Sequence, residues 1–161
     1  MNVFRLQNLK SRSFFALLAC LIAVSSLLII GILRDRNAVS PNDARVVRIG
    51  NYEYKLIHAR TEFERQVGLS SYNIMPPKSA MIFVSDKPGD MKFWMKDMKF
   101  SIDIVWLSEK NQIIRIIDRL SPSTYPRAYS SIMPAKYVIE FPAGAAQKSK
   151  ILEGDYITLS N

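Results

Sequence analysis

The 20 residues from Phe14 to Leu33 contain no charged side chain, and this run divides the chain into two parts. As an α-helix rising about 1.5 Å per residue, it would span roughly 30 Å, the thickness of one hydrocarbon core. Secretory h-regions are shorter, about 7–15 residues, and end at a cleavage site of small residues. No good site of this kind follows Leu33. We therefore expect residues 14–33 to form an uncleaved transmembrane signal anchor in contact with membrane lipid.

The segments on either side of this run predict a location. Residues 1–13 form a basic arm that contains Arg5, Lys10 and Arg12 and no acid. A basic arm before an apolar run is the order of an export signal, although the arginines after the run weaken the positive-inside bias. We expect a single-pass protein of the bacterial inner membrane, with residues 34–44 as a linker. Residues 45–161 would then be one globular domain on the extracytoplasmic (periplasmic) side.

This domain has no cysteine, and its 117 residues are enough to bury a core without disulfide bonds. It carries 17 lysine and arginine residues against 12 acidic ones. A moderate positive charge favours contact with acidic lipid headgroups or anionic wall polymers.

Alternating apolar and polar residues recur along the domain. Gly50-Asn51 is a hairpin signal between two such runs, 46–49 and 52–57. Helical patterns are limited to 61–67, where Thr61 and Glu64 form a capping box, and to 143–150. The predicted fold is mainly β (β-rich α+β): a small barrel-like or strongly curved, mostly antiparallel sheet with two short helices. Further strands are expected at 80–84, 91–96, 102–107, 112–117 and 136–141.

The segment 91–106 holds both tryptophans of the chain. In a strand over 91–96, one face would be apolar, and the other would place a tryptophan between two ammonium groups. The apolar face would contain Met91, Phe93 and Met95, and the opposite face Lys92, Trp94 and Lys96. Either a loop covers the Trp94 ring beneath the lysine stems, or the ring is exposed and binds something flat or anionic.

Two acidic residues interrupt apolar strands. The run 102–107 is apolar apart from Asp103, which predicts a strand covered on both sides. A buried carboxylate there needs a cation or several backbone N–H donors, so Asp103 is either a structural anchor or a polar group of a site. Glu140 alternates with Ile139 and Phe141 and would face the side opposite to theirs.

Several segments together resemble the domain-of-unknown-function 192 family over essentially all of residues 46–160. Phe93-Trp-Met-Lys96 is the most specific of them. The resemblance implies a small, mainly β fold in bacteria and archaea, and it implies no activity. Asp97-Met98 replaces the family's Asn-Thr, and Ser101-Ile102 its Pro-Leu, so a site that used the Asn-Thr pair would be altered here. The other matching segments are Glu64-Arg65-x-x-Gly68-Leu69, Met81–Phe83, Ile102–Ile104, Ala135–Glu140, Ala143-Gly144 and Gly154-Asp155.

The residues restrict the available chemistry. His58 is the only histidine, and Cys20 lies in the apolar run, so neither a zinc site nor a nucleophile–histidine pair can be assembled. No phosphate-binding loop occurs either, and we expect no metal and no cofactor. Carboxylates remain, and a pair about 5–10 Å apart would suit glycoside hydrolysis. The candidates are Asp90, Asp97, Asp103 and Glu140.

The favoured hypothesis is a binding or assembly module for an anionic envelope component, such as a glycan, or for an envelope protein. A carboxylate-dependent enzyme acting on envelope glycan is the first alternative. Nucleic-acid binding is the second, but the expected location argues against it. The candidate ligand-binding residues are Lys92, Trp94, Lys96, Arg65, Asp103 and Glu140.

Overall fold

The computed structural model describes residues 41–161. The predicted membrane anchor at 14–33, the basic arm at 1–13 and most of the predicted linker lie outside the described residues. Within 41–161, no helix is both long and apolar enough to cross a membrane.

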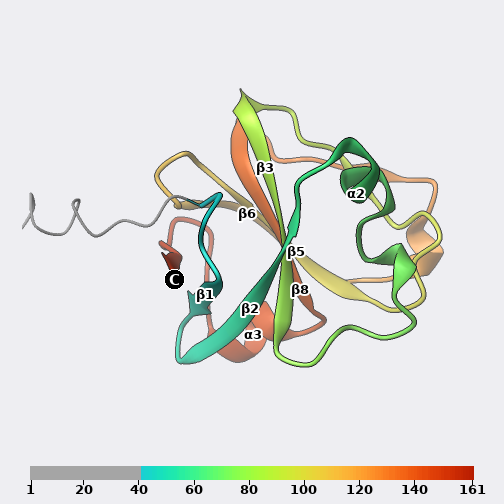
Figure 1. Ribbon diagram of the computed structural model, residues 1–161, viewed down its shortest axis with the longest axis horizontal. Helices are drawn as coiled ribbons and strands as arrows, with labels where there is room; N and C mark the ends of the chain where they lie inside the picture. Colours follow the sequence, from blue (N-terminus) through green and yellow to red (C-terminus); the bar gives the residue numbers. More distant parts are fainter. Residues whose placement is uncertain (1–40) are drawn as a thin grey trace, which may run out of the picture. The chain divides into compact units, whose positions relative to one another are not determined.

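A curled seven-stranded sheet forms the body of the domain (Figure 1), in the spatial order β6-β5-β8-β3-β2-β1-β9. β4 and β7 make a separate two-stranded sheet. Two short α-helices and two 3-10 turns complete the described chain. The elements are β1 Val46–Ile49, β2 Tyr52–Ala59, α2 Glu62–Val67, η1 Gly68–Ser71, β3 Ser79–Gly89, β4 Phe93–Trp94, β5 Ile102–Leu107, β6 Ile113–Leu120, η2 Pro122–Thr124, β7 Ala128–Tyr129, β8 Ala135–Pro142, α3 Ala145–Ser149 and β9 Thr158–Ser160.

The sheet is mixed, because β2 and β3 run parallel while the other neighbours in it are antiparallel. Parallel neighbours need a crossover connection, and here α2 and η1 provide it between the two strands. The expected antiparallel pairing is therefore correct for every pair in this sheet except this one. The crossover places α2 beside the sheet and so creates one wall of the site described below.

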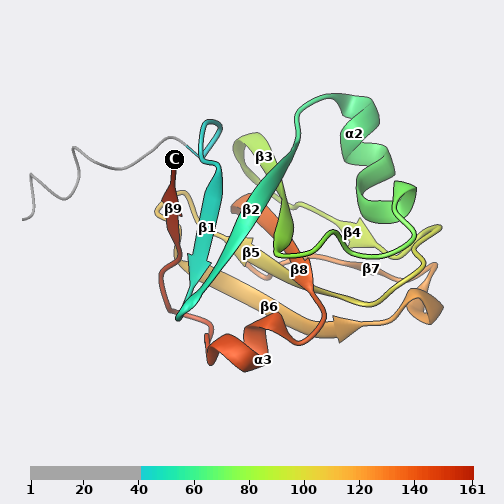
Figure 2. The ribbon, with the colours of Figure 1, turned by 60° about the horizontal axis from the view of Figure 1, so that its bottom comes forward.

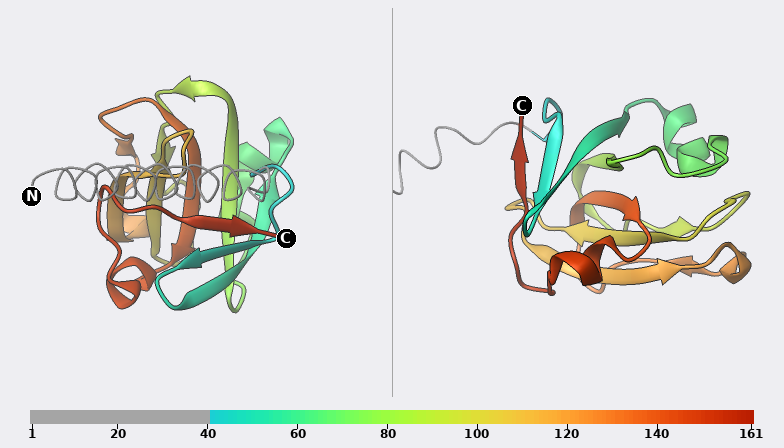
Figure 3. Two further views of the ribbon diagram at one scale, coloured as in Figure 1. Left: turned by 90° about the vertical axis from the view of Figure 1, so that its left-hand side faces the viewer. Right: turned by 90° about the horizontal axis from the view of Figure 1, so that it is seen from below.

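The sheet curls until its two ends approach each other, which makes a half-barrel (Figure 3). Gln112 and Tyr156 form an isolated antiparallel bridge just before β6 and β9. Next to this bridge, the Ile113 N–H donates to the Asp155 carbonyl at 2.8 Å, and the Ile157 N–H donates to the Asn111 carbonyl at 3.0 Å. The predicted strongly curved sheet is thus observed.

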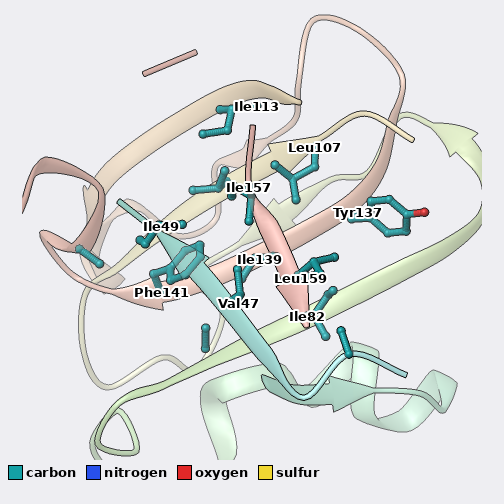
Figure 4. Packing of buried hydrophobic residues seen from close by; sticks show 14 residues of the cluster. Val47, Ile49, Ile82, Leu107, Ile113, Tyr137, Ile139, Phe141, Ile157 and Leu159 are labelled. Atoms are coloured by element: carbon teal, nitrogen blue, oxygen red, sulfur yellow. The ribbon is translucent and has the colours of Figure 1, made fainter. Parts of the chain in front are cut away.

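Apolar side chains cover both faces of the sheet. The interior of the curl is filled by a cluster from β1, β3, β5, β8 and β9, in which Val47, Ile139, Phe141 and Leu159 lie close together (Figure 4). A second cluster, which includes Phe83 and Trp106, lies on the outer face under η1 and β4. Strand β5 is buried along its whole length because it contributes to both clusters.

The predicted capping box forms at the start of α2. The Glu64 N–H donates to Thr61 Oγ1 at 3.1 Å, and the Thr61 N–H donates to Glu64 Oε2 at 2.8 Å. The backbone N–H groups of Thr61 and Arg60 donate to the Glu64 carboxyl and lower its pKa. Gly68 ends the helix with a φ of 51°, a conformation that glycine adopts at little cost.

The segment 91–96 differs from its prediction, since only Phe93 and Trp94 form a strand, β4. β4 pairs with β7, which lies in a stretch where the sequence predicted no strand. The predicted alternation of faces nevertheless holds: Met95 is buried, whereas Lys92 and Lys96 are exposed.

Candidate functional site

A cavity of about 220 Å³ lies on the outer face of the sheet, between the α2–η1 crossover and the segment 91–98. We call it the α2 cleft. Figure 2 shows its walls, α2 and β4, at the end of the domain away from β1 and β9. The cleft is lined by Arg65, Gln66, Val67, Gly68, Leu69, Phe83, Met91, Lys92, Phe93, Trp94, Lys96, Met98 and Glu140.

Glu140 enters the cleft from the sheet. It lies on β8 directly opposite Met81 of β3 and Ile104 of β5, and cross-strand partners share a face of the sheet. Its side chain is only 6% exposed, and Oε2 has no hydrogen-bond partner within the described residues. Burial raises the pKa of Glu140 from 4.5 to about 8. At neutral pH this carboxyl is therefore mainly protonated and can donate a hydrogen bond.

The walls around Glu140 are largely apolar and aromatic. Leu69 is buried beneath the crossover, and the Phe83 and Phe93 rings meet edge to face with their centroids 4.8 Å apart. Met91 and Met98 add flexible apolar surface. Such walls bind the apolar part of a ligand and keep water away from the carboxyl.

Three cations complete the lining, and they differ in how far they are neutralised. Arg65 forms an ion pair with Glu62 at 3.0 Å, and Lys92 forms one with Asp90 at 3.3 Å. Lys96 has no ion-pair partner within residues 41–161. The exposed part of the cleft is therefore positively charged, and Lys96 is available to an anion.

Trp94 lies beside these cations on β4. Its side chain is 57% exposed, so the ring is not covered by a loop, and the exposed-ring hypothesis is the one that the structure favours. An exposed indole next to lysine side chains can stack on a flat group.

Asp103 is the sequence candidate that lies elsewhere. It is opposite Phe141, one residue from Glu140, and therefore on the other face of the sheet. Its carboxylate accepts three backbone N–H groups, all at 2.8 Å, from Arg119, Gly144 and Ala146. Burial raises the pKa of Asp103, and these three donors offset part of the rise. Asp103 is the structural anchor that one of the two sequence hypotheses described.

The remaining candidates do not add chemistry to the α2 cleft. Asp97 sits at positive φ, three residues after Trp94 of β4. His58 Nε2 lies 2.7 Å from the Ala44 carbonyl oxygen, away from the cleft. In the part of the chain that the structure describes, no three metal-ligating side chains come together.

The sequence patterns did not indicate the apolar lining of the cleft. Phe83 and Leu69 belong to segments read only as a strand and a helix end. A helix between two apolar strands is the signal of a β–α–β crossover, and it would have predicted the contact of 65–69 with the sheet.

A larger hollow of about 940 Å³ lies over β1 and β2, but its polar side chains are all at least partly exposed. Arg48 there is ion-paired with Glu53, and Lys148 lies 4.5 Å from the centre of the Tyr52 ring. This surface resembles ordinary solvated sheet and lacks a buried polar group such as Glu140.

The family model described as DUF192, Uncharacterized ACR, matches residues 45–159, which is most of the chain. The chain belongs to this family. The DUF192 domain therefore coincides with the curled sheet and with every residue of the α2 cleft. Among the curated proteins, none matches this chain.

Two solved structures share the fold of this DUF192 domain. A protein of unknown function from Novosphingobium aromaticivorans is 23% identical with a TM-score of 0.65, and the match covers 74% of this chain and 90% of that one. A protein described as a putative transcription regulator from Sinorhizobium meliloti is 22% identical with a TM-score of 0.66, and the match covers 72% and 92%. At this identity the likeness concerns the fold alone.

Proposed function

We propose that the domain is a binding module, and that the α2 cleft receives an anionic group of an envelope component or of a protein partner. The observation that carries the proposal is the unpaired Glu140 carboxyl inside an apolar cleft bordered by cations. A buried polar group without a partner costs about 1–3 kcal/mol, and a ligand that hydrogen-bonds to it recovers this cost. Lys96 supplies the free positive charge for the anion.

Binding accounts for the cleft better than carboxylate catalysis does. Glycoside hydrolysis needs two carboxyl groups on either side of the scissile bond. Within residues 41–161, Glu140 is the only acid that lines the cleft, because Asp103 lies on the opposite face of the sheet.

We also propose that residues 14–33 tether this module to the bacterial inner membrane, with the domain on the periplasmic side. The support is the charge-free run of spanning length without a good cleavage site. Intact-mass analysis of the protein from the membrane fraction should show that residues 14–33 are retained. A mature N-terminus beyond Leu33 would contradict the tether.

The binding proposal is tested with a simple apolar anion. The full chain, held in nanodiscs of zwitterionic lipid, is titrated with 3-phenylpropionate and with the uncharged 3-phenylpropanol, following tryptophan emission. The anion should bind more tightly, and Lys96→Ala should weaken its binding about two- to fivefold, the range of an exposed ion pair.

Lys99→Ala is the matched control, because Lys99 is exposed, donates to Asn73 Oδ1 at 3.0 Å and does not line the cleft. Equal losses in the two lysine variants, or no preference for the anion over the alcohol, would refute the proposed function.

A further inference from the structure

The α2 cleft combines three chemically different zones within about 220 Å³. Cations border it, and one of them, Lys96, has no ion-pair partner within residues 41–161. Aromatic and aliphatic side chains line it, and the Glu140 carboxyl enters it from the sheet. A ligand that satisfies all three zones must carry an anionic group, an apolar part and a polar group that suits Glu140.

The surroundings of Glu140 decide what this polar group is. The charged side chains that face the cleft are Arg65 from α2 and Lys92 and Lys96 from the segment around β4, and all three are cationic. A cationic ligand group would have to pass these charges to reach Glu140. A second anion at that depth would be desolvated without a counter-charge. A neutral hydrogen-bonding group meets neither obstacle.

A carboxylic acid offers one O–H donor and one carbonyl acceptor side by side. The amide of an acylated amino acid is trans, so its acceptor oxygen and its N–H donor point in opposite directions, and Glu140 can reach only one of them. The neutral carboxyl would donate its O–H to the amide oxygen. Oε2 of Glu140, which has no partner within residues 41–161, is the atom that this hydrogen bond would satisfy.

Resting on the proposed binding function, we propose that the ligand of the α2 cleft is an N-acylated amino acid with an apolar side chain, whose carboxylate meets Lys96 and whose amide hydrogen-bonds to a neutral Glu140. This chemistry occurs in free acylated amino acids and in the C-terminal residue of a protein. At about 220 Å³ the cleft is smaller than the roughly 300–1,000 Å³ of pockets for drug-sized ligands, which favours one residue over a long chain.

The experiment compares probes that differ by one group, again with the full chain in zwitterionic nanodiscs. N-acetyl-L-phenylalanine carries all three features, 3-phenylpropionate lacks the amide, and N-acetyl-L-phenylalanine amide lacks the charge. We expect N-acetyl-L-phenylalanine to bind about five- to tenfold more tightly than 3-phenylpropionate, which is the typical contribution of one hydrogen bond.

Two variants of Glu140 assign this preference to its carboxyl. Glu140→Gln keeps a neutral donor and acceptor of the same size, so it should keep the preference for the acylated probe. Glu140→Leu should abolish the preference while still binding 3-phenylpropionate, which shows that the variant is folded.

The pH dependence provides a second readout. Burial raises the pKa of Glu140 to about 8, so between pH 7 and pH 9 the wild-type carboxyl loses its proton. Binding of the acylated probe should weaken by about tenfold over this range, and binding by Glu140→Gln should not follow it. Because Arg65, Lys92 and Lys96 are unchanged in Glu140→Gln, the difference between the two proteins isolates Glu140.

A pentapeptide ending in phenylalanine, with a free or an amidated C-terminus, distinguishes the two sources of such a ligand, a free acylated amino acid and the C-terminal residue of a protein. Tight binding of the free-acid peptide identifies a protein C-terminus, and binding of the single acylated residue alone identifies a small molecule. If 3-phenylpropionate binds as tightly as the acylated probe, the amide assignment is overturned while the binding function stands. If neither anion binds, the proposed function fails as well.

Discussion

Two carboxyl groups are buried on adjacent strands of the same sheet, and they have opposite surroundings. Asp103 on β5 is fully buried and accepts three backbone N–H groups from β6 and from the start of α3. Glu140 on β8 is 6% exposed, and its Oε2 accepts none. The residues differ by one position in register, which places them on opposite faces of the sheet.

The two carboxyl groups differ in whether the domain itself supplies their hydrogen-bond partners. The Asp103 carboxylate ties three backbone segments together, so its hydrogen bonds are satisfied within the domain. The Glu140 carboxyl is buried at a cost that nothing in residues 41–161 offsets, and it faces a cavity. Under the proposed function, a bound ligand would offset this cost. Four measurements test whether the contrast is real, from the largest expected effect to the smallest.

The largest effect is the pH dependence that Glu140 imposes on stability. Its pKa is about 8 in the folded protein against 4.5 as the ordinary value, so between these pH values the folded state holds a proton that the unfolded state has released. Stability should therefore fall as the pH rises from 4.5 to 8, by about 1.4 kcal/mol per unit and roughly 5 kcal/mol in total.

Urea unfolding of the wild type and of Glu140→Gln at pH 5, 6.5 and 8 measures this effect. As the pH rises, the wild type should lose stability relative to Glu140→Gln. A constant difference would show that Glu140 is not desolvated.

Asp103→Asn should lower the free energy of unfolding by about 3 kcal/mol, because it replaces a charged acceptor of three N–H groups and turns one oxygen into a donor. Thermal and urea melts at pH 7 check it. Asp118→Asn is the matched control, since Asp118 is an exposed acid near Asp103 whose ion pair with Arg119 lies at the surface. Similar melts for both variants would contradict the role of Asp103 as an anchor.

Glu140→Met should have the opposite sign and raise the free energy of unfolding by about 1–3 kcal/mol at pH 5, where the pH-dependent penalty on Glu140 is still small, since it removes an unpaired buried polar group and keeps the volume. Urea unfolding measures it. If the variant is less stable than the wild type, Glu140 has a partner, and the contrast with Asp103 disappears.

Trp94→Ala should cost least, about 1 kcal/mol, because much of the ring is exposed. Met95→Ala is the comparison next in the chain: Met95 is 1% exposed, and its truncation should cost about 2–5 kcal/mol. Thermal melts of the two variants measure both losses. A Trp94→Ala melt as low as that of Met95→Ala would show that the indole is a core residue and not part of a binding surface.

Local patterns in the sequence predicted the local structure well, for reasons that lie in neighbouring residues. Thr61 and Glu64 form their capping box because both partners lie within one turn of helix. Met95 is buried and Trp94 exposed because successive side chains point to opposite sides, even though the strand itself is only two residues long.

Pairing between distant segments was predicted less well. The predicted mostly antiparallel sheet is observed, but the sequence did not indicate which pair would be parallel, and β2 and β3 are parallel across the α2 crossover. No strand was predicted at β7, because a two-residue strand has too short a pattern to recognise and forms only through its contact with β4.

The sequence by itself determined that a charge-free segment of spanning length precedes a mainly β domain, and which face of each strand is apolar. It also determined that Asp103 and Glu140 interrupt apolar faces. Only the tertiary structure decided that one of these carboxyl groups is paired and the other is not. The N–H groups that reach Asp103 come from residues 16 to 43 positions away, and the cleft at Glu140 exists because a crossover helix and the segment 91–98 meet over the sheet. A local pattern predicts that a side chain is buried. Whether a buried polar group finds a hydrogen-bond partner depends on which backbone segments, distant in the sequence, lie beside it in the fold.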